Sequence, residues 1–293
     1  MKVGFIGLGR MGAGMAGRVQ GAGYQLTVFD AIATQTAPFA AAGARVATSV
    51  ADLCQERDVV VSMLVEDATI LSVTTGPEGL VDSLTPGAIH LVMGTHGVAT
   101  IRTLEAKHAE AGQILVAAPV LGRPDLAAAG QLGIVVGGPL EAATRVRPLL
   151  ESMGRRLFEA GPKPESATAI KLANNAVLGC AMVAMAEGFA LVRKYGVQPQ
   201  VFQDVMVEGL FASTAYKVYG QKMVDESYDQ VGSPITVGLK DALLIAAAAD
   251  VARVPMPSHD VYHQRLLGAV AHGDADRDQA VLAREQARAA GIE

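Results

Sequence analysis

The sequence predicts an α/β protein, with a parallel, doubly wound sheet in its first part and only helices in its second. Over residues 1–162, short apolar runs typical of buried strands alternate with segments of helical spacing. After the Pro- and Gly-rich stretch "GPKPE" at 161–165, no convincing strand pattern remains, and Ala-, Leu- and Met-rich helical segments follow. We therefore expect two domains, residues 1–162 and residues 163–293.

The individual elements of the first domain follow from their hydrophobic patterns. Six runs have the length and apolar content of buried strands, at 2–7, 24–30, 58–64, 88–94, 113–120 and 132–138. Four segments between them have helical spacing, at 12–22, 34–42, 50–57 and 98–112. Because strands alternate with helices, both faces of the sheet are expected to be covered.

Composition excludes several classes of protein. Hydrophobic residues make up 51% of the 293 residues, which is enough for a sizeable core and argues against disorder. The 24 basic and 29 acidic residues give a formal charge of −5, so no electrostatic footprint for nucleic acid exists. Cys54 and Cys180 form no metal-binding or CxxC spacing, so no metal is expected, and they fit a reduced, cytoplasmic protein.

The apolar run 176–192 is about long enough to cross a bilayer, but we do not expect a membrane span. Glu187 and Gly188 interrupt it, and neither an aromatic belt nor a basic flank frames it. We expect instead a helix buried against a second domain or a partner chain. The opening residues, "MKVGFIGLG", form a strand-like run without the pattern of a signal peptide.

The stretch "GLGRMG" at 7–12 predicts a dinucleotide site. It follows a strand and opens a helix, as a G-x-G-x-x-G motif must if the helix N-terminus is to receive a pyrophosphate. The first glycine permits the tight turn, the second lets the backbone approach the phosphates, and the third lets helix and strand pack closely. The expected cofactor-binding residues of this turn are Gly7, Leu8, Gly9, Arg10, Met11 and Gly12.

Asp30 stands at the end of the second predicted strand and bears on which cofactor is bound. Its carboxylate is placed to accept hydrogen bonds from the adenosine ribose hydroxyls, and it would repel a 2′-phosphate. The following residues, "AIATQT", supply no arginine for such a phosphate. NAD(H) is therefore expected over NADP(H), with NADP(H) still possible.

The segment "IKLANN" at 170–175 begins a predicted helix that is otherwise almost entirely apolar, and this segment contains three polar side chains. Lys171 and Asn175 lie four residues apart and so share one helix face, with Asn174 beside them. Either these residues form a solvated first turn, or they carry chemistry. An ammonium can stabilise a developing alkoxide and donate a proton to it.

Several motifs together make the chain resemble the β-hydroxyacid dehydrogenase family, which includes 3-hydroxyisobutyrate dehydrogenases, tartronate semialdehyde reductases and glyoxylate/succinic semialdehyde reductases. The motifs stand in the family's order, at 7–12, 94–97 ("GTHG"), 118–125 ("APVLGRPD"), 170–175 and 239–241 ("LKD"). The resemblance implies an N-terminal Rossmann domain and a helical C-terminal domain joined by the long helix that carries Lys171.

The resemblance also implies roles for individual residues. Lys171 matches the family's catalytic acid/base, and Asn175 matches the asparagine that hydrogen-bonds the substrate. The remaining matches are Thr95 as a residue near substrate and nicotinamide, Met63 and Leu64 as the lining of the nicotinamide, Lys240 as a second lysine near the cofactor, and Asp241 as the residue that orients it. Without that role, Lys240 would be a surface residue and Asp241 a helix cap.

The segment that holds the substrate departs from the family pattern. Leu121 stands where the family has a serine, and Arg123 stands where it has a second glycine. The backbone N–H of Gly122 remains available, and Arg123 either holds an anionic substrate group with its planar fork or pairs on the surface with Asp125. His96, in "GTHG", is expected to be an ordinary loop residue rather than a polar group of the pocket.

The preferred reading is an enzyme that transfers a hydride between NAD(H) and a small β-hydroxy acid or the matching aldehyde or ketone. An imine reductase resembles this architecture but generally lacks the lysine. A 6-phosphogluconate dehydrogenase needs a much longer helical domain. A non-catalytic dinucleotide sensor remains open because of the altered substrate segment. The apolar surface of the helical domain predicts a homodimer or homotetramer.

Overall fold

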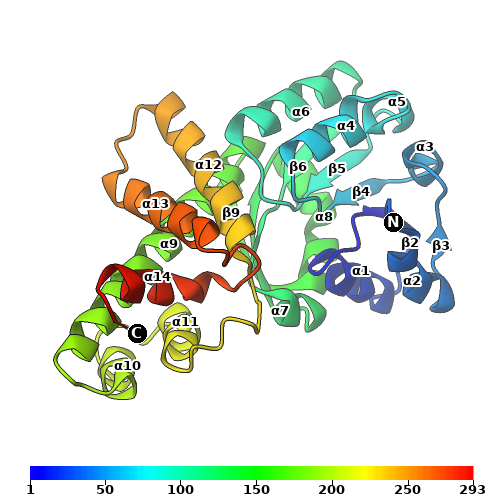
Figure 1. Ribbon diagram of the computed structural model, residues 1–293. Coiled ribbons are helices and arrows are strands. Elements are labelled where there is room, and N and C mark those ends of the chain that lie inside the picture. Colours follow the sequence, from blue (N-terminus) through cyan, green and yellow to red (C-terminus); the bar gives the residue numbers. More distant parts are fainter. Residues whose placement is uncertain (293) are drawn as a thin grey trace. The chain divides into compact units, whose positions relative to one another are not determined.

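A computed structural model describes residues 1–292, and these residues form two compact units. The first comprises Met1–Lys171 and the second Leu172–Glu293. The predicted boundary at 162/163 lies just before the long helix α9 (Pro164–Lys194), and the compact units divide inside this helix. All strands of the described residues belong to the first unit, as predicted (Figure 1).

The first unit contains one nine-stranded sheet in the order β3-β2-β1-β4-β5-β6-β8-β7, with β9 paired to β8. The six predicted strands are confirmed as β1 (Lys2–Ile6), β2 (Gln25–Phe29), β4 (Val59–Ser62), β5 (Ile89–Val92), β6 (Ile114–Ala117) and β8 (Leu132–Gly137). Three further strands are β3 (Arg45–Val46), β7 (Val120–Leu121) and β9 (Gly154–Gly161). The sheet therefore has three more strands than the sequence patterns indicated.

The sheet is mostly parallel, as predicted, and one strand near one end runs antiparallel to two of its neighbours. Strands β1 to β6 run parallel to one another, whereas β8 runs antiparallel to both β6 and β7. A parallel neighbour requires a crossover, usually through a helix of some length. The connection from β6 to β8 contains only β7 and the short helix α7 (Pro124–Ala128), which packs against α1 (Gly12–Gly21).

Helices cover both faces of the sheet, as the alternating pattern predicted. One face packs against α1 and α8 (Leu140–Met153), and its core includes Val3, Phe5 and Val61. The other face packs against α3 (Val50–Cys54), α4 (Asp67–Thr75), α5 (Leu80–Ser83) and α6 (Val98–Glu110). The short helix α2 (Ala37–Ala41) follows β2. The carboxyl ends of β1, β4 and β5 consequently meet at one sheet edge, where ligands bind in such folds.

The second unit is entirely helical among its described residues. It continues α9 and adds α10 (Pro199–Glu208), α11 (Thr214–Val224), α12 (Ile235–Ala252), α13 (Pro257–Ala271) and α14 (Leu282–Ala289). Phe189, Tyr228 and Leu266 contribute to its core. By length and composition alone, α9 is one helix that could cross a membrane, and 44% of the apolar window within it is buried. A core helix of a globular domain meets the same criterion.

Candidate cofactor and catalytic sites

The glycine-rich turn after β1 has the geometry that a dinucleotide requires. Gly7 has φ of +90°, a conformation that favours glycine. A Cβ on Gly12 would lie 1.9 Å from the Gly7 carbonyl oxygen, so only glycine fits there. A Cβ on Gly9 would meet no atom within 4 Å, so the backbone at Gly9 faces open space. That space is where the motif requires a pyrophosphate to approach.

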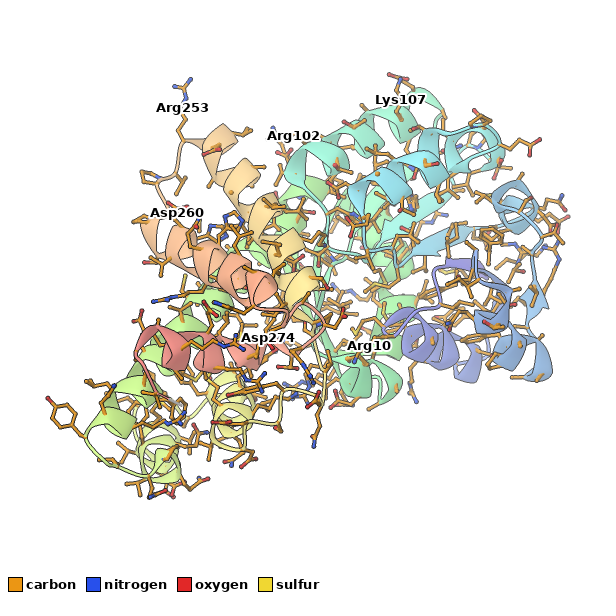
Figure 2. All side chains as sticks on the ribbon, in the orientation of Figure 1. Arg10, Arg102, Lys107, Arg253, Asp260 and Asp274 are labelled. Atoms are coloured by element: carbon orange, nitrogen blue, oxygen red, sulfur yellow. The ribbon has the colours of Figure 1, made fainter. Side chains whose placement is uncertain are left out.

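Helix α1 begins at Gly12 without a side-chain cap and without an acidic residue in its first turn. Its N-terminal N–H groups and its dipole are therefore available to an anion. Of the neighbouring predicted residues, Leu8 is buried, Met11 is half-buried, and Arg10 is exposed (Figure 2). The turn thus suits the phosphates of a nicotinamide dinucleotide.

Asp30 lies directly against this turn. Its Oδ2 accepts a hydrogen bond of 2.7 Å from the Leu8 backbone N–H, and its Oδ1 accepts one of 2.8 Å from the N–H of Ile32. A carboxylate has about four acceptor positions, so it can still accept hydrogen bonds from ribose hydroxyls. The predicted proximity of Asp30 to the glycine turn is therefore present in the structure.

The turns after β4 and β5 bring three further predicted residues to the same sheet edge. Met63 and Leu64 follow β4, Thr95 follows β5, and all three are half-buried. The Met63 N–H donates to the Ile6 carbonyl, at the end of β1. The two turns also touch each other, because a Cβ on Gly94 would lie 2.3 Å from the Leu64 carbonyl oxygen. The cofactor-lining residues predicted in this unit thus share one edge.

His96 is a correction to the sequence analysis, because it is not an ordinary loop residue. It is only 1% exposed, and its Nδ1 lies 2.8 Å from Oδ1 of Asp67, at the start of α4. The Asp67 carboxylate also accepts from the Gly97 N–H and from the Thr100 hydroxyl. Burial raises the pKa of Asp67, but the hydrogen bonds from His96, Thr100 and Gly97 outweigh burial and lower it.

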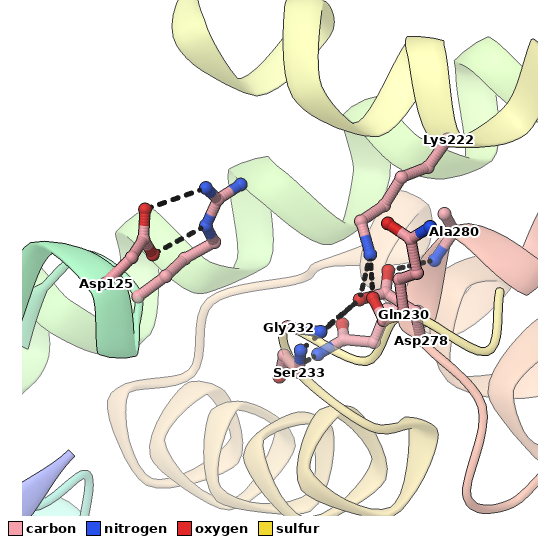
Figure 3. A network of polar contacts seen from close by, with 9 residues as sticks. Asp125, Lys222, Gln230, Gly232, Ser233, Asp278 and Ala280 are labelled. Carbon is pink, nitrogen blue, oxygen red and sulfur yellow. Dashed lines mark hydrogen bonds and ion pairs between the residues drawn. The ribbon is translucent and has the colours of Figure 1, made fainter. Parts of the chain in front are cut away.

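The segment 121–123 adopts the surface alternative considered for its arginine. Leu121 pairs with Gly133 in the sheet, and Gly122 is exposed with φ of +148°. The Arg123 guanidinium donates to both carboxylate oxygens of Asp125, at 3.3 and 3.1 Å (Figure 3). The hydrogen bond from Arg123 lowers the pKa of Asp125. An arginine in this state presents its Nε and Nη2 fork to a substrate anion only by exchanging Asp125 for that anion.

Lys171 and Asn175 stand one turn apart on α9, both half-buried. In the second unit, Asn175 Nδ2 donates to Oδ2 of Asp241 at 2.8 Å. Lys240 Nζ lies 2.8 Å from Oδ1 of the same carboxylate. Asp241 therefore orients both the amide and the second lysine, which the sequence analysis expected only for the lysine.

A buried carboxylate that sequence reasoning did not single out supports the start of α12. Asp278 is fully buried and accepts from the N–H groups of Gly232 and Ser233 and from Lys222 Nζ (Figure 3). Lys222 also donates to the Gln230 carbonyl. These contacts fix the loop that leads into α12, which carries Lys240. A lone Asp in a polar stretch, as in "DADRDQ", gave no local signal of this role.

Among residues 1–292, no group of three or more His, Cys, Asp or Glu side chains is arranged to hold a metal ion. The polar groups at the sheet edge and on α9 and α12 are instead hydrogen-bonding and acid/base groups. They can bind a dinucleotide, donate to an oxyanion and move a proton.

Comparison with known proteins gives matches over nearly the whole chain. Residues 2–161 match the NAD-binding domain of 6-phosphogluconate dehydrogenase. Residues 166–285 match the NAD-binding domain of NADP-dependent 3-hydroxyisobutyrate dehydrogenase. The two matched ranges meet near the predicted domain boundary.

Three relatives illustrate the similarity. An uncharacterized oxidoreductase of Bacillus subtilis is 36% identical, over 96% of this chain and 98% of its own. An NAD-dependent L-serine dehydrogenase of Pseudomonas aeruginosa is 35% identical, over 96% of both chains. The solved structure of a Mycobacterium tuberculosis 3-hydroxyisobutyrate dehydrogenase with L-serine has a TM-score of 0.88 and 26% identity, covering 97% of this chain and 98% of that one.

Proposed function

Because this chain belongs to the β-hydroxyacid dehydrogenase family of NAD(P)-dependent enzymes, we propose that it transfers a hydride between NAD(H) and a small β-hydroxy acid, with Lys171 as general acid/base. The observation that carries the proposal is the presence of both halves of such a site. One half is the glycine turn with Asp30 beside it, and the other is the helix with Lys171 and Asn175 on one face.

The proposed chemistry divides between cofactor and protein. The bound nicotinamide supplies or accepts the hydride. In the oxidative direction, the neutral Lys171 amine accepts the proton of the substrate hydroxyl. In the reductive direction, the ammonium stabilises the developing alkoxide and returns that proton.

Asn175 is proposed to orient the substrate hydroxyl. Its Nδ2 already donates to Asp241, which holds the amide plane and leaves Oδ1 as a hydrogen-bond acceptor. An amide held by a second residue loses less conformational freedom on binding than a free one. Asp241 is thus a positioning residue.

NAD(H) is proposed as the preferred cofactor. The Asp30 carboxylate would repel the 2′-phosphate of NADP(H), and it sits beside the turn that carries the pyrophosphate. In assays of the wild-type enzyme, turnover with NAD should therefore exceed turnover with NADP.

The proposed substrates are hydroxy acids with the hydroxyl β to a carboxylate. Two of the similar proteins are named for L-serine and 3-hydroxyisobutyrate, which share this arrangement. The substrate carboxylate is proposed to meet the Gly122 N–H and the guanidinium of Arg123. Arg123 would exchange the exposed Asp125 for it, a small loss because exposed ion pairs contribute little.

The test is lysine-dependent turnover. L-serine, 3-hydroxyisobutyrate and short semialdehydes are assayed with each cofactor, using wild type and Lys171→Ala. Loss of general acid/base catalysis should lower kcat by about 10²- to 10⁴-fold and leave NADH affinity nearly unchanged. Lys194→Ala, at the other end of the same helix, is the matched control. Undiminished activity of Lys171→Ala would refute the assignment.

Two other functions give different results when a cyclic imine is added to the same panel of substrates. An imine reductase would reduce cyclic imines and show no activity on hydroxy acids. A dinucleotide sensor would bind NADH and turn over none of the panel. The lysine and asparagine on α9 argue against both, since neither function requires that pair.

The enzyme is also proposed to be a homodimer or homotetramer. Large apolar side chains remain exposed on the helical unit, among them Leu191, Val205 and Leu210. Exposed apolar surface of this kind is typical of interfaces between copies.

A further inference from the structure

We propose that His96, held by Asp67, is a positioning residue for the nicotinamide end of the cofactor site, a role that rests on the proposed function. The sequence analysis expected His96 to be only an ordinary loop residue. It acts through its neighbours, since it lies next to Thr95 in sequence and against Leu64 in space.

The contact with Asp67 shows that Nδ1 of the His96 ring carries a hydrogen. The hydrogen bonds that Asp67 receives lower its pKa, so the carboxylate is ionised near neutral pH and can only accept. The Nδ1 of His96, 2.8 Å from Oδ1, must therefore carry a hydrogen and donate it. This hydrogen bond fixes the orientation of the ring, as a carboxylate does for catalytic and metal-binding imidazoles.

Asp67 joins three parts of the sheet edge through one carboxylate. It belongs to the first turn of α4, which follows the turn containing Met63 and Leu64. It receives the Gly97 N–H at 3.1 Å and the Thr100 hydroxyl at 2.7 Å, both at the start of α6. Because Gly97 has no side chain to cap α6, the Asp67 carboxylate takes that place from another helix.

The other nitrogen of His96 faces the predicted nicotinamide lining. Its Nε2 is buried and has no hydrogen-bond partner within residues 1–292. A Cβ on Gly94 would lie 2.6 Å from this Nε2 and 2.3 Å from the Leu64 carbonyl oxygen. The ring edge, the Gly94 backbone and the Leu64 carbonyl therefore meet at one point.

This arrangement is unlike that of a mere space-filling residue. An apolar side chain would fill the same volume without burying an unsatisfied polar atom. The imidazole instead ties the turn after β5, which presents Thr95, to the turn after β4, which presents Met63 and Leu64. Small displacements of such groups reduce hydride transfer strongly, because the reacting atoms must be aligned within a fraction of an ångström.

The first test separates positioning from stability by kinetics. His96→Ala is compared with wild type for oxidation of L-serine and of L-serine deuterated at C3, with NAD. We expect kcat to fall at least about tenfold and the deuterium isotope effect to rise, because hydride transfer becomes rate-limiting. His96→Asn, which can still donate to Asp67, should recover part of kcat, and Asp67→Asn should resemble His96→Ala.

The matched control is His259→Ala in the helical unit. His259 is also buried with an unpartnered Nε2, so its loss should lower the melting temperature comparably without changing the isotope effect. If His96→Ala lowered only the melting temperature and left kcat and the isotope effect unchanged, the role would be structural and the proposal wrong.

A second readout needs no substrate. Bound NADH is titrated by fluorescence, which reports both its dissociation constant and the surroundings of the nicotinamide ring. In His96→Ala, the dissociation constant should change less than about threefold, since adenosine and pyrophosphate contacts remain, whereas nicotinamide emission and lifetime should approach those of free NADH. Unchanged emission would overturn the proposal. Lysine-independent or absent turnover in wild type would instead refute the proposed function alone.

Discussion

Four buried side chains form a hydrogen-bonded chain whose direction can be assigned from one end. Gln113 donates through Nε2 to the carbonyls of Val81 and Leu84, so its Oε1 must accept from Nδ1 of His108. The Nε2 of His108 then accepts from Nδ1 of His90, and the Nε2 of His90 accepts from the Ser62 hydroxyl. Both imidazoles are consequently neutral, each with its proton on Nδ1.

The hydrogen-bonded histidines His90 and His108 predict that the protein loses stability in acid. Burial, with the nearby His108 and His96, lowers the pKa of His90 well below its usual 6.5, and burial lowers that of His108. Below about pH 6.5, His90 and His108 therefore become protonated in the unfolded chain but stay neutral in the folded protein. The free energy of unfolding consequently falls as the pH is lowered from neutral. Each histidine contributes up to about 1.4 kcal/mol per pH unit.

The measurement is the urea midpoint at pH 7.5 and at pH 5.5. Wild type should lose stability between the two, and His90→Phe/His108→Phe should lose less, although it starts from a lower value because Ser62 and Gln113 lose their partners. Equal losses in both proteins would place the acid sensitivity elsewhere.

At the scale of elements, the glycines of the turn between β1 and α1 and of α1 itself have different structural roles. Gly12 is required by packing, because a Cβ would meet the Gly7 carbonyl oxygen at 1.9 Å. A Cβ on Gly9 would meet no atom of residues 1–292 within 4 Å, so packing does not require glycine there, and the predicted reason for glycine is the approach of a pyrophosphate. Gly17, on the exposed side of α1, is constrained by neither.

Three alanine substitutions should therefore separate folding from binding. Gly9→Ala should keep the melting temperature and weaken NADH binding at least about tenfold, because the methyl group occupies the phosphate approach. Gly12→Ala should lower both. Gly17→Ala should keep binding and gain up to about 1 kcal/mol of helix stability. Tight NADH binding by Gly9→Ala would contradict the assignment of this turn.

The elements that could be predicted from sequence are those with a strong local signal. The central strands β1, β2, β4 and β5 consist mostly of apolar residues, and the glycine motif places α1. Strand β9 was missed because it is largely exposed and reads "GRRLFEAG", without apolar continuity. Strand β8 was predicted, but its antiparallel direction was not, because direction depends on the connection and not on the strand itself.

The same distinction applies to the site. Gly7, Gly9, Gly12 and Asp30 belong to one motif with fixed spacing, so the sequence places them together. Helices α4 and α5 and strand β5 lie between Asp67 and His96 in the sequence, and nothing local marks either residue as a partner. Only the adjacency of β4 and β5 in the sheet brings their turns into contact. Partners of this kind require the topology.

At the scale of the whole molecule, the helical unit leaves several large apolar side chains exposed. Leu210 is 93% exposed, Val205 is 65% exposed and Leu191, on α9, is 60% exposed. Together with the incomplete burial of the apolar part of α9, these residues need a covering surface. We propose that this surface is a second copy of the chain, because self-association would bury the same patch on each copy.

We accordingly predict that wild type is a dimer or tetramer by light scattering in the absence of detergent. Leu191→Glu/Val205→Glu should shift it towards monomer while far-UV circular dichroism is retained, because buried charges without partners destabilise an interface by several kcal/mol. Leu140→Glu is the matched control, since Leu140 is also largely exposed, at 77%, on the sheet-containing unit. A monodisperse wild-type monomer would refute self-association. Solubility only in detergent would mean instead that α9 meets lipid.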